Sequence, residues 1–386
     1  MANTMAQKST PSAQDTSQRA RTRGRGARAP AQASGELYAA LDLGTNSCRM
    51  LIAMPQGHQF KIVDAFAKSV RLGADLERTG ALSRSSIERT VRALQVCASK
   101  LRKLNVKNTR LVATEACRRA KNGASFLSQV EKRTGLTLEI IRPEEEARLA
   151  VISCAPLVGA ESEHVLVFDI GGGSTELVWI DVSDVPPAER PAAVAKLDIR
   201  NRLRDGGKPG VARIVDFISV PLGVATLHER YDDVEDESAR FALMSWYFEE
   251  HLSSFLPYQD LGVLHGVAGF QMIGTSGTVT TVASAHLGLK RYDRRKVDGL
   301  TLTEAQIDAV ISRLVALGPA GRQAEPSIGK DRAELILSGA AILQTLLRIW
   351  PTDRLGVADR GLREGILLSM MYRQGALVAG GRYGGR

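Results

Sequence analysis

The 386-residue chain has few cysteines, no metal-binding spacing of histidines and no long apolar run. Its four cysteines form no C-x-x-C pair, and its six histidines form no H-x-x-x-H pair. This scarcity argues against a disulfide framework or a structural zinc site, and it favours reduced thiols in the cytoplasm. The most apolar stretch, 165–180, is interrupted by two acids and three glycines, and the N-terminus has no apolar segment. We therefore expect a cytoplasmic protein with neither a membrane span nor a secretory signal.

Composition is otherwise that of a globular protein, with 44% hydrophobic and 24% charged residues. The length predicts two domains and a tail. The net charge of +9 is uneven, because residues 1–34 hold six lysines and arginines against one acid. This tail has no valine, leucine or isoleucine, so we expect residues 1–35 to be disordered. Its arginines could touch a polyanion nonspecifically, but a solvated tail is the favoured interpretation, and we predict no specific nucleic-acid partner.

Hydrophobic periodicity predicts a first α/β half. Ser85 to Glu88 has capping-box spacing and predicts the start of a long helix. Strands are expected at 38–43, 49–54, 60–67, 111–114 and 137–141, with helices at 85–104 and 122–133.

A second half follows, and Pro143 opens its first helix with three glutamates in the first turn. The stretch 186–210 is charged and rich in proline and glycine, so we interpret it as an insertion. Strands are expected at 165–169, 175–181, 213–220 and 272–274, with helices at 240–255, 278–286, 304–317, 333–349 and 362–374.

An internal repeat relates the two halves at an offset of 127 residues. It sets D-L-G-T-N-S-C-R-M-L-I (42–52) against D-I-G-G-G-S-T-E-L-V-W (169–179). Each copy reads as strand, acidic turn, strand, which predicts two similar α/β halves facing each other across a cleft. The alignment pairs Asp42 with Asp169, Gly44 with Gly171, Ser47 with Ser174 and Arg49 with Glu176.

Three turns have the composition of phosphate-binding loops. Glycines let the backbone approach a ligand and turn several N–H groups one way, as phosphate binding requires. The third turn enters a helix, whose N-terminus suits an anion, although a plain N-cap by Ser276 or Thr278 explains the same residues. The predicted phosphate-binding residues of these turns are Gly44, Asn46 and Ser47; Gly171, Gly172, Gly173 and Ser174; and Gly274, Ser276, Gly277 and Thr278.

The acids beside these turns are candidates for metal binding and proton transfer. Asp169 ends a buried strand, where an unpaired carboxylate is costly and a divalent cation is a suitable partner. A glycine-rich hairpin with incidental acids is the alternative, but the recurrence at Asp42 disfavours it. Adjacent carboxylates at Glu144, Glu145 and Glu146 raise one another's pKa, so one could act as a base. Surface acids would look the same, and the residues alone do not choose among the three.

Together these motifs resemble the exopolyphosphatase/guanosine pentaphosphate phosphatase (Ppx/GppA) family. Its fold belongs to the actin-like ATPase superfamily, an α/β duplication of two ribonuclease H-like domains around a phosphate-binding cleft. The resemblance runs from about residue 38 to 372. Besides the repeat, it includes R-L-G-A-D-L (71–76), A-T-E-A-C-R-R-A-K-N (113–122), E-E-E-A-R-L (144–149), G-T-S-G-T (274–278) and G-L-R-E-G (361–365).

The resemblance implies roles for individual residues. It makes Glu146 and Glu176 catalytic, gives Arg118 a phosphate contact, and implies Mg²⁺ or Mn²⁺ held by Asp169, Glu176 and Asp42. It also implies domains at 36–142, completed by the C-terminal helix of 362–386, and at 143–361. The chain ends soon after G-L-R-E-G, so we expect none of the extra C-terminal helical domains of the family's long members.

The activity implied is metal-assisted hydrolysis of a terminal phosphoanhydride by a homodimer. We expect inorganic polyphosphate as the substrate, with pppGpp as the alternative. Long polyphosphate is favoured by two basic clusters, at Arg202, Arg204, Lys208 and Arg213, and at Lys290, Arg291, Arg294, Arg295 and Lys296.

Three other functions would share the glycine turns. Glu146 in E-A-R-L argues against a sugar kinase and against an ATP-driven chaperone or filament protein. A non-enzymatic nucleotide or polyphosphate sensor would not need both Glu146 and Glu176.

Overall fold

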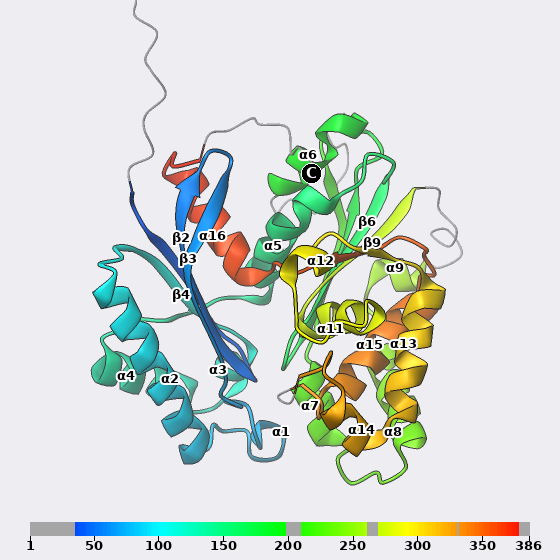
Figure 1. Cartoon of the computed structure of the whole chain (residues 1–386), viewed down its shortest axis with the longest axis horizontal. Coiled ribbons are helices and arrows are strands. Elements are labelled where there is room, and N and C mark those ends of the chain that lie inside the picture. The colour runs from blue at the N-terminus through cyan, green and yellow to red at the C-terminus, as the bar shows by residue number, and fades with distance from the viewer. Residues whose placement is uncertain (1–34, 198–209, 261–268, 330–331, 378–386) are drawn as a thin grey trace, which may run out of the picture. The chain divides into compact units, whose positions relative to one another are not determined.

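The computed structural model describes residues 35–197, 210–260, 269–329 and 332–377 (Figure 1). The predicted tail, apart from Gly35, lies outside the described residues, and so do Arg202, Arg204 and Lys208. None of the described helices is long and apolar enough to cross a membrane.

The first sheet has the strand order β3-β2-β1-β4-β5. Strands β1 to β3 pair antiparallel, whereas β4 runs parallel to β1, and β5 runs parallel to β4. The strands are β1 (Tyr38–Leu43), β2 (Ser47–Gln56), β3 (Gln59–Ser69), β4 (Asn108–Ala113) and β5 (Glu139–Ile140).

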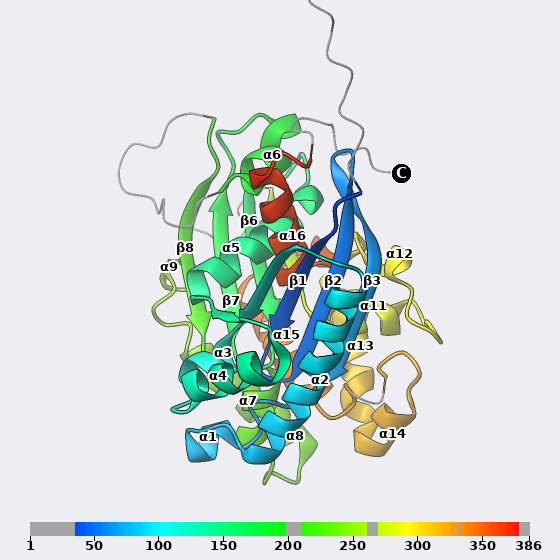
Figure 2. The same cartoon turned by 90° about the vertical axis from the view of Figure 1, so that its left-hand side faces the viewer.

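Side chains that alternate along β1 and β2 give this sheet two apolar faces. Leu41 and Met50 pack under α2 (Arg84–Lys103) and α4 (Gly123–Thr134), which cover one face (Figure 2). Ala40 and Leu51 point the other way, onto α16 (Leu362–Arg373). The first sheet therefore completes its core with a helix from the far end of the folded chain. The short helices of this half are α1 (Leu76–Thr79) and α3 (Glu115–Arg119).

The second sheet has the order β10-β11-β9-β6-β7-β8. Strands β6 to β8 pair antiparallel, β9 and β11 extend the sheet in parallel from β6, and β10 pairs antiparallel with β11. The strands are β6 (His164–Ile170), β7 (Thr175–Asp181), β8 (Arg213–Val220), β9 (Phe270–Thr275), β10 (Thr301–Leu302) and β11 (Leu355–Ala358).

Helices cover both faces of this sheet as well. One face packs against α8 (Glu237–Glu250), α11 (Gly277–His286), α13 (Glu304–Ala316) and α15 (Ile336–Ile349). The other packs against α5 (Pro143–Cys154) and α6 (Arg190–Ala195). The remaining elements are η1 (Ala155–Leu157), η2 (Pro187–Glu189), α7 (Val224–Arg230), α9 (Leu256–Gln259), α12 (Arg294–Val297) and α14 (Gly318–Ala324).

The two sheets share one topology, since β8-β7-β6-β9-β11 repeats the order and directions of β3-β2-β1-β4-β5. This is the ribonuclease H-like fold present twice, as in the actin-like ATPases, so the predicted fold class is confirmed. The internal sequence repeat is also present in the register of the paired strands. Asp42 lies opposite Arg49 across β1 and β2, and Asp169 lies opposite Glu176 across β6 and β7.

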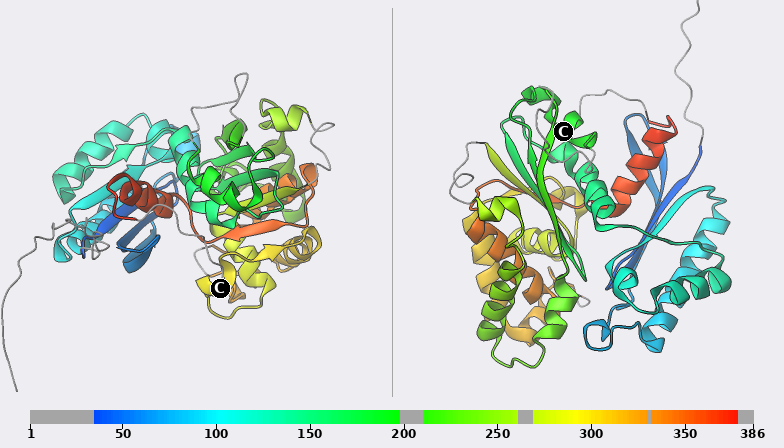
Figure 3. Two further views of the ribbon diagram at one scale, coloured as in Figure 1. Left: turned by 90° about the horizontal axis from the view of Figure 1, so that it is seen from above. Right: turned by 180° about the vertical axis from the view of Figure 1, so that it is seen from behind.

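Helices α5 and α16 lie side by side between the two sheets (Figure 3). Gly365 permits this approach, because a β-carbon at that position would overlap the carbonyl oxygen of Leu149. The second glycine of G-L-R-E-G therefore has a packing reason: only hydrogen fits between the helices.

Some local predictions are wrong. The N-cap of α2 is Ser83, whose hydroxyl accepts the Ser86 N–H, rather than Ser85, and Glu88 pairs with Arg133 instead of closing a capping box. The stretch interpreted as an insertion is in part core. Val194 of α6 is fully buried in the cluster that covers the second sheet.

Candidate active site

Both acidic turns open into one pocket with a volume of about 180 Å³. The two turns contact each other directly, since a β-carbon at Gly172 would lie 3.0 Å from the Asn46 nitrogen. A β-carbon at Gly173 would overlap the hydroxyl of Thr45. The glycines of the second turn are thus required by the approach of the first turn, and the pocket lies where the two halves meet.

Equivalent hydrogen bonds close the two turns. The Gly44 N–H donates to the Ser47 carbonyl at 3.0 Å, and the Gly171 N–H donates to the Ser174 carbonyl at 2.9 Å. A third segment fixes the second turn from behind, because the N–H of Val224 donates to the Gly171 carbonyl at 2.9 Å.

The free amides of the second turn suit an anion. Among the described residues no acceptor is found for the N–H groups of Gly172 and Gly173. The carbonyl of Gly172, by contrast, accepts the N–H of Ala225 at 2.8 Å. Successive unbonded N–H groups beside a pocket form the kind of concavity that binds phosphate oxygens.

Burial raises the pKa of several carboxyl groups in the pocket. Burial, followed by the charges of Glu146 and Asp42, raises the pKa of Asp169 to about 7. Burial and the charge of Asp169 raise the pKa of Glu176 to about 7, although a hydrogen bond from Ser219 at 2.9 Å opposes the shift. The pKa of Asp42 is also raised by burial, against the opposing charge of Arg49. An added positive charge would stabilise all three carboxylates.

Of the three consecutive glutamates on α5, Glu146 lines the pocket. Burial and the charge of Glu176 raise the pKa of Glu146 well above its usual value. Arg118 donates to its Oε2 atom at 2.9 Å and opposes this shift. Glu145 instead pairs with Arg110 and Arg148 outside the pocket, so the structure separates two acids that the sequence left equivalent.

Two predicted phosphate ligands do not line the pocket. Arg118 lies behind Glu146, where its guanidinium also pairs with Glu115 at 2.9 Å and donates to the Ile141 carbonyl at 2.8 Å. Gly274 lies within β9, where a β-carbon would meet the Phe168 ring at 2.5 Å, so packing explains this glycine.

The rest of the third turn does reach the pocket. Ser276 caps α11 by accepting the N–H of Thr278 at 3.1 Å, as the capping interpretation requires. Its φ of 142° is strained for a residue with a side chain, and such strain concentrates at functional sites. The predicted residues that line the pocket are Asp42, Gly44, Asn46, Ser47, Glu146, Asp169, Gly171, Gly172, Gly173, Ser174, Glu176, Ser276, Gly277 and Thr278.

The donor set fits a hard divalent cation. The described residues contain no group of three or more Asp, Glu, His or Cys side chains placed to hold a metal by themselves. Mg²⁺ does not need such a cage, because it commonly takes one or two carboxylates and completes its shell with water and substrate phosphates. Buried carboxylates with raised pKa values, such as Asp169 and Glu176, are suitable oxygen donors of this kind.

The pocket also contains four arginines that the prediction of the site did not include: Arg49, Arg332, Arg360 and Arg363. Among the described residues Arg49 has no hydrogen-bond or ion-pair partner, and burial and the charge of Arg363 lower its pKa. Arg332 donates to the Gly277 carbonyl at 3.2 Å and to the Thr281 hydroxyl at 2.8 Å. Arg49 could have been found from the repeat and Arg363 from G-L-R-E-G, whereas no sequence signal marked Arg332.

Glycine turns, acids with raised pKa values and several arginines in one pocket are typical of an enzyme that acts on phosphoryl groups. The comparisons agree, because the model of the Ppx/GppA phosphatase family matches residues 51–374. The chain belongs to this family.

Relatives of known name or structure cover most of the chain. It is 27% identical over 337 residues to the guanosine-5'-triphosphate,3'-diphosphate pyrophosphatase of Aeromonas salmonicida (strain A449). That match covers 87% of this chain and 59% of the relative, so the chain spans about three-fifths of that protein's length.

Two solved structures illustrate the likeness in three dimensions. The Ppx/GppA family member of Aquifex aeolicus is 28% identical with a TM-score of 0.66, over 88% of this chain and 98% of that one. An exopolyphosphatase from Cytophaga hutchinsonii has a TM-score of 0.72 at 21% identity, over 88% and 98% of the two chains, and shares the fold.

Proposed function

We propose that this protein is a metal-dependent hydrolase that releases orthophosphate from the end of a phosphoanhydride chain, with inorganic polyphosphate as its substrate. The observation that carries the proposal is the position of Glu146: a carboxylate of raised pKa, with its side chain 12% exposed, in a pocket formed by glycine turns. A phosphate-binding pocket without such a base would suit a sensor, whereas a base beside the phosphates suits hydrolysis.

In this proposal the turns bind the terminal phosphoryl group. The N–H groups of Gly172 and Gly173 and the polar side chains of Asn46 and Ser47 supply donors to its oxygens. Arg49, which has no partner among the described residues, supplies a positive charge. These groups are fixed before substrate arrives, so they stabilise the developing charge without reorganising.

Asp169, Glu176 and Asp42 are the residues that would hold Mg²⁺ or Mn²⁺, which would supply charge neutralisation at the phosphoryl oxygens. Glu146 orients the attacking water and accepts its proton, while Arg118 fixes the orientation of the Glu146 carboxylate. The acceptor is water and not a sugar hydroxyl, which separates this reaction from that of a kinase.

pppGpp is a second candidate substrate, and the name of the Aeromonas relative favours it. Both substrates end in a phosphoanhydride, and the pocket residues named above contact only phosphate. Polyphosphate is preferred here because Lys290, Arg291 and Lys296 are exposed and close in sequence to Arg294, which donates to the carbonyl of the pocket residue Asp359.

The test is orthophosphate release from long polyphosphate, pppGpp and ATP, compared as kcat/KM with Mg²⁺ and after chelation. We expect the highest value for long polyphosphate and loss of activity on chelation. A higher value for pppGpp would make that the substrate. ATP hydrolysis without release from either of the others would favour the kinase or chaperone alternatives.

We also propose a cytoplasmic homodimer, on the family resemblance. Light scattering during size-exclusion chromatography would measure the mass in solution, and a monomeric mass would contradict the dimer.

A further inference from the structure

We propose that Arg363 binds a phosphate of the substrate, and that Glu364 and Arg294 hold its guanidinium group in position. This inference rests on the function proposed above and extends it to the opposite wall of the pocket. Neither Glu364 nor Arg294 needs to touch the substrate in this scheme.

Arg363 has donors available for a ligand. It lines the pocket at the start of α16, and its side chain is 20% exposed. Its one ion pair with described residues is to the Oε1 atom of Glu364, at 4.0 Å. A guanidinium group carries five N–H donors, so most of this hydrogen-bonding capacity is unused. The group is also close enough to lower the pKa of Asp42 and of Arg49, which places its charge inside the site.

Glu364 is a buried acid that caps the start of α16. Its residue is 3% exposed, and its Oε2 atom accepts the N–H of Gly361 at 3.0 Å, which caps α16. Its Oε1 atom accepts a hydrogen bond from Arg294 at 3.2 Å and faces Arg363. A buried carboxylate needs a partner of opposite charge, and here the Oε1 atom has two, Arg294 at 3.2 Å and Arg363 at 4.0 Å.

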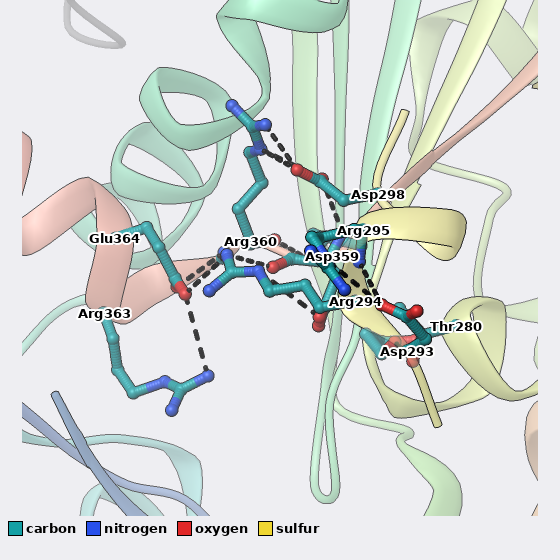
Figure 4. Close-up of polar contacts among 12 residues, drawn as sticks. Thr280, Asp293, Arg294, Arg295, Asp298, Asp359, Arg360, Arg363 and Glu364 are labelled. Carbon is teal, nitrogen blue, oxygen red and sulfur yellow. Dashed lines mark hydrogen bonds and ion pairs between the residues drawn. The ribbon is translucent and has the colours of Figure 1, made fainter. Parts of the chain in front are cut away.

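Arg294 hydrogen-bonds both to Glu364 and to a residue of the pocket wall. Its Nη2 atom donates both to Glu364 and to the carbonyl of Asp359, the latter at 2.5 Å. The wall is fixed further by Arg360, which pairs with Asp298 (Figure 4). Asp359, Arg360 and Arg363 all line the pocket.

These contacts correct one expectation for Arg294. The sequence placed it in a free surface cluster, but its guanidinium is engaged by two acids and a carbonyl. Because α12 belongs to the second half and α16 packs on the first sheet, Arg294 sets where Arg363 stands relative to the glycine turns. We therefore assign Arg294 a positioning role and not a direct one.

The experiment uses tripolyphosphate, which is too short to reach a distant surface. Binding is measured by calorimetry with Mg²⁺, and turnover by orthophosphate release, for Arg363→Ala, Arg363→Lys, Arg294→Ala and the double variant. Arg295→Ala is the matched control, because its side chain is adjacent in sequence, equally charged and 93% exposed.

We expect Arg363→Ala to raise Kd and KM by about tenfold or more, since a hydrogen bond to a charged group is lost. Arg363→Lys should recover part of this loss, because it keeps the charge without the planar fork. Arg294→Ala should raise KM in the same direction, and the double variant should be no worse than Arg363→Ala, because both act through one contact.

Unchanged binding in Arg363→Ala would overturn the proposal, as would additive losses in the double variant or a Kd shift in Arg295→Ala as large as that in Arg294→Ala. Failure of the parent protein to bind tripolyphosphate would also overturn it. Binding without orthophosphate release from any substrate would instead contradict the proposed function and leave the assignment of Arg363 to be decided by the binding data.

Discussion

Among single residues, the proposed mechanism demands that Glu146 act as a base beside the carboxylates of Glu176 and Asp42. In the proposed mechanism Glu146 would meet this demand, because burial and Glu176 raise its pKa while Arg118 lowers it. The same arginine orients the carboxylate through the Oε2 atom, which leaves Oε1 for a water molecule. Arg118, which does not line the pocket, therefore both lowers the pKa of Glu146 and holds one oxygen of its carboxylate.

Removing the base should separate binding from turnover. Glu146→Gln keeps the volume and the hydrogen-bonding capacity but cannot accept a proton. We expect kcat to fall by ~10²–10⁴-fold with little change in the Kd for polyphosphate, because the glycine turns and arginines are untouched. Orthophosphate-release assays would measure kcat, and calorimetry would measure the Kd. A kcat near that of the parent would refute the role of Glu146 as a base.

The pH dependence of kcat/KM should report the ionisation of Glu146. Below the pKa of Glu146 the carboxylate is protonated and cannot act as a base, so kcat/KM should fall as pH decreases. Arg118 lowers that pKa, so Arg118→Gln should move the acidic limb of the kcat/KM profile to higher pH. A limb that stays in place, or moves to lower pH, would show that Glu146 does not control the profile.

At the scale of elements, the phosphate turn of the second half is held by the segment that enters α7. A β-carbon at Gly223 would lie 2.5 Å from the Gly171 carbonyl oxygen and 2.6 Å from the Gly172 carbonyl carbon. These neighbours are backbone atoms, which cannot move aside without moving the turn itself. The position of the phosphate donors thus depends on a residue that does not line the pocket.

Gly223→Ala should therefore damage activity more than it damages the fold. We expect a stability loss of ~1–3 kcal/mol from overpacking, together with a rise in KM as the turn is displaced. Gly356→Ala on β11 is the control, because its nearest neighbours lie at 3.5 Å, which is ordinary contact. Thermal unfolding and steady-state kinetics on both variants would check this, and equal KM values in the two would count against the displaced turn.

Predictions from the sequence succeeded where local signals and tertiary packing agree. The strand 38–43 and the turns that follow Asp42 and Asp169 were found because β-strand patterning and glycine both mark them. β11 was missed because its four residues, LGVA, are too few to show a period. The packed helix α6 was missed because proline and charge around it suggested a loop, whereas Val194 is buried by tertiary contacts that no local pattern reveals.

In the candidate active site too, residues with a local sequence signal were predicted and residues placed by tertiary contacts were not. The turns were predictable from glycines and acids, and the choice of Glu146 required the family resemblance. Arg332 was not predictable, because its place in the pocket depends on its bonds to Gly277 and Thr281, about fifty residues away.

At the scale of the whole molecule, charge outside the pocket should decide which phosphate chains bind well. Arg294 and Arg295 of the predicted cluster have acid partners, and Arg213 pairs with Asp181 and Asp184. Among the described residues, no ion pair is found for the exposed cations Lys290, Arg291 and Lys296. Within the predicted cluster, these three residues are available to hold a long chain.

Replacing Lys290, Arg291 and Lys296 together with alanine should raise KM for long polyphosphate severalfold and leave that for tripolyphosphate nearly unchanged. The salt dependence of binding to long chains should also become shallower, because fewer phosphate contacts form and fewer counterions are released on binding. Kinetics at two chain lengths and several salt concentrations would measure both effects. An equal effect at both lengths would argue against an extended track and in favour of pppGpp.

The packing of α16 on the first sheet also has a consequence for how the protein is made. Tyr38, Ala40 and Leu51 emerge early from the ribosome, but the face they form is covered by Ile366 and Met370, which are synthesised after the entire second half. Until then this half of the nascent chain carries an uncovered apolar surface, the kind of surface that chaperones bind. Synthesis of the first half alone should therefore yield an aggregation-prone fragment, which a separately supplied α16 peptide would solubilise.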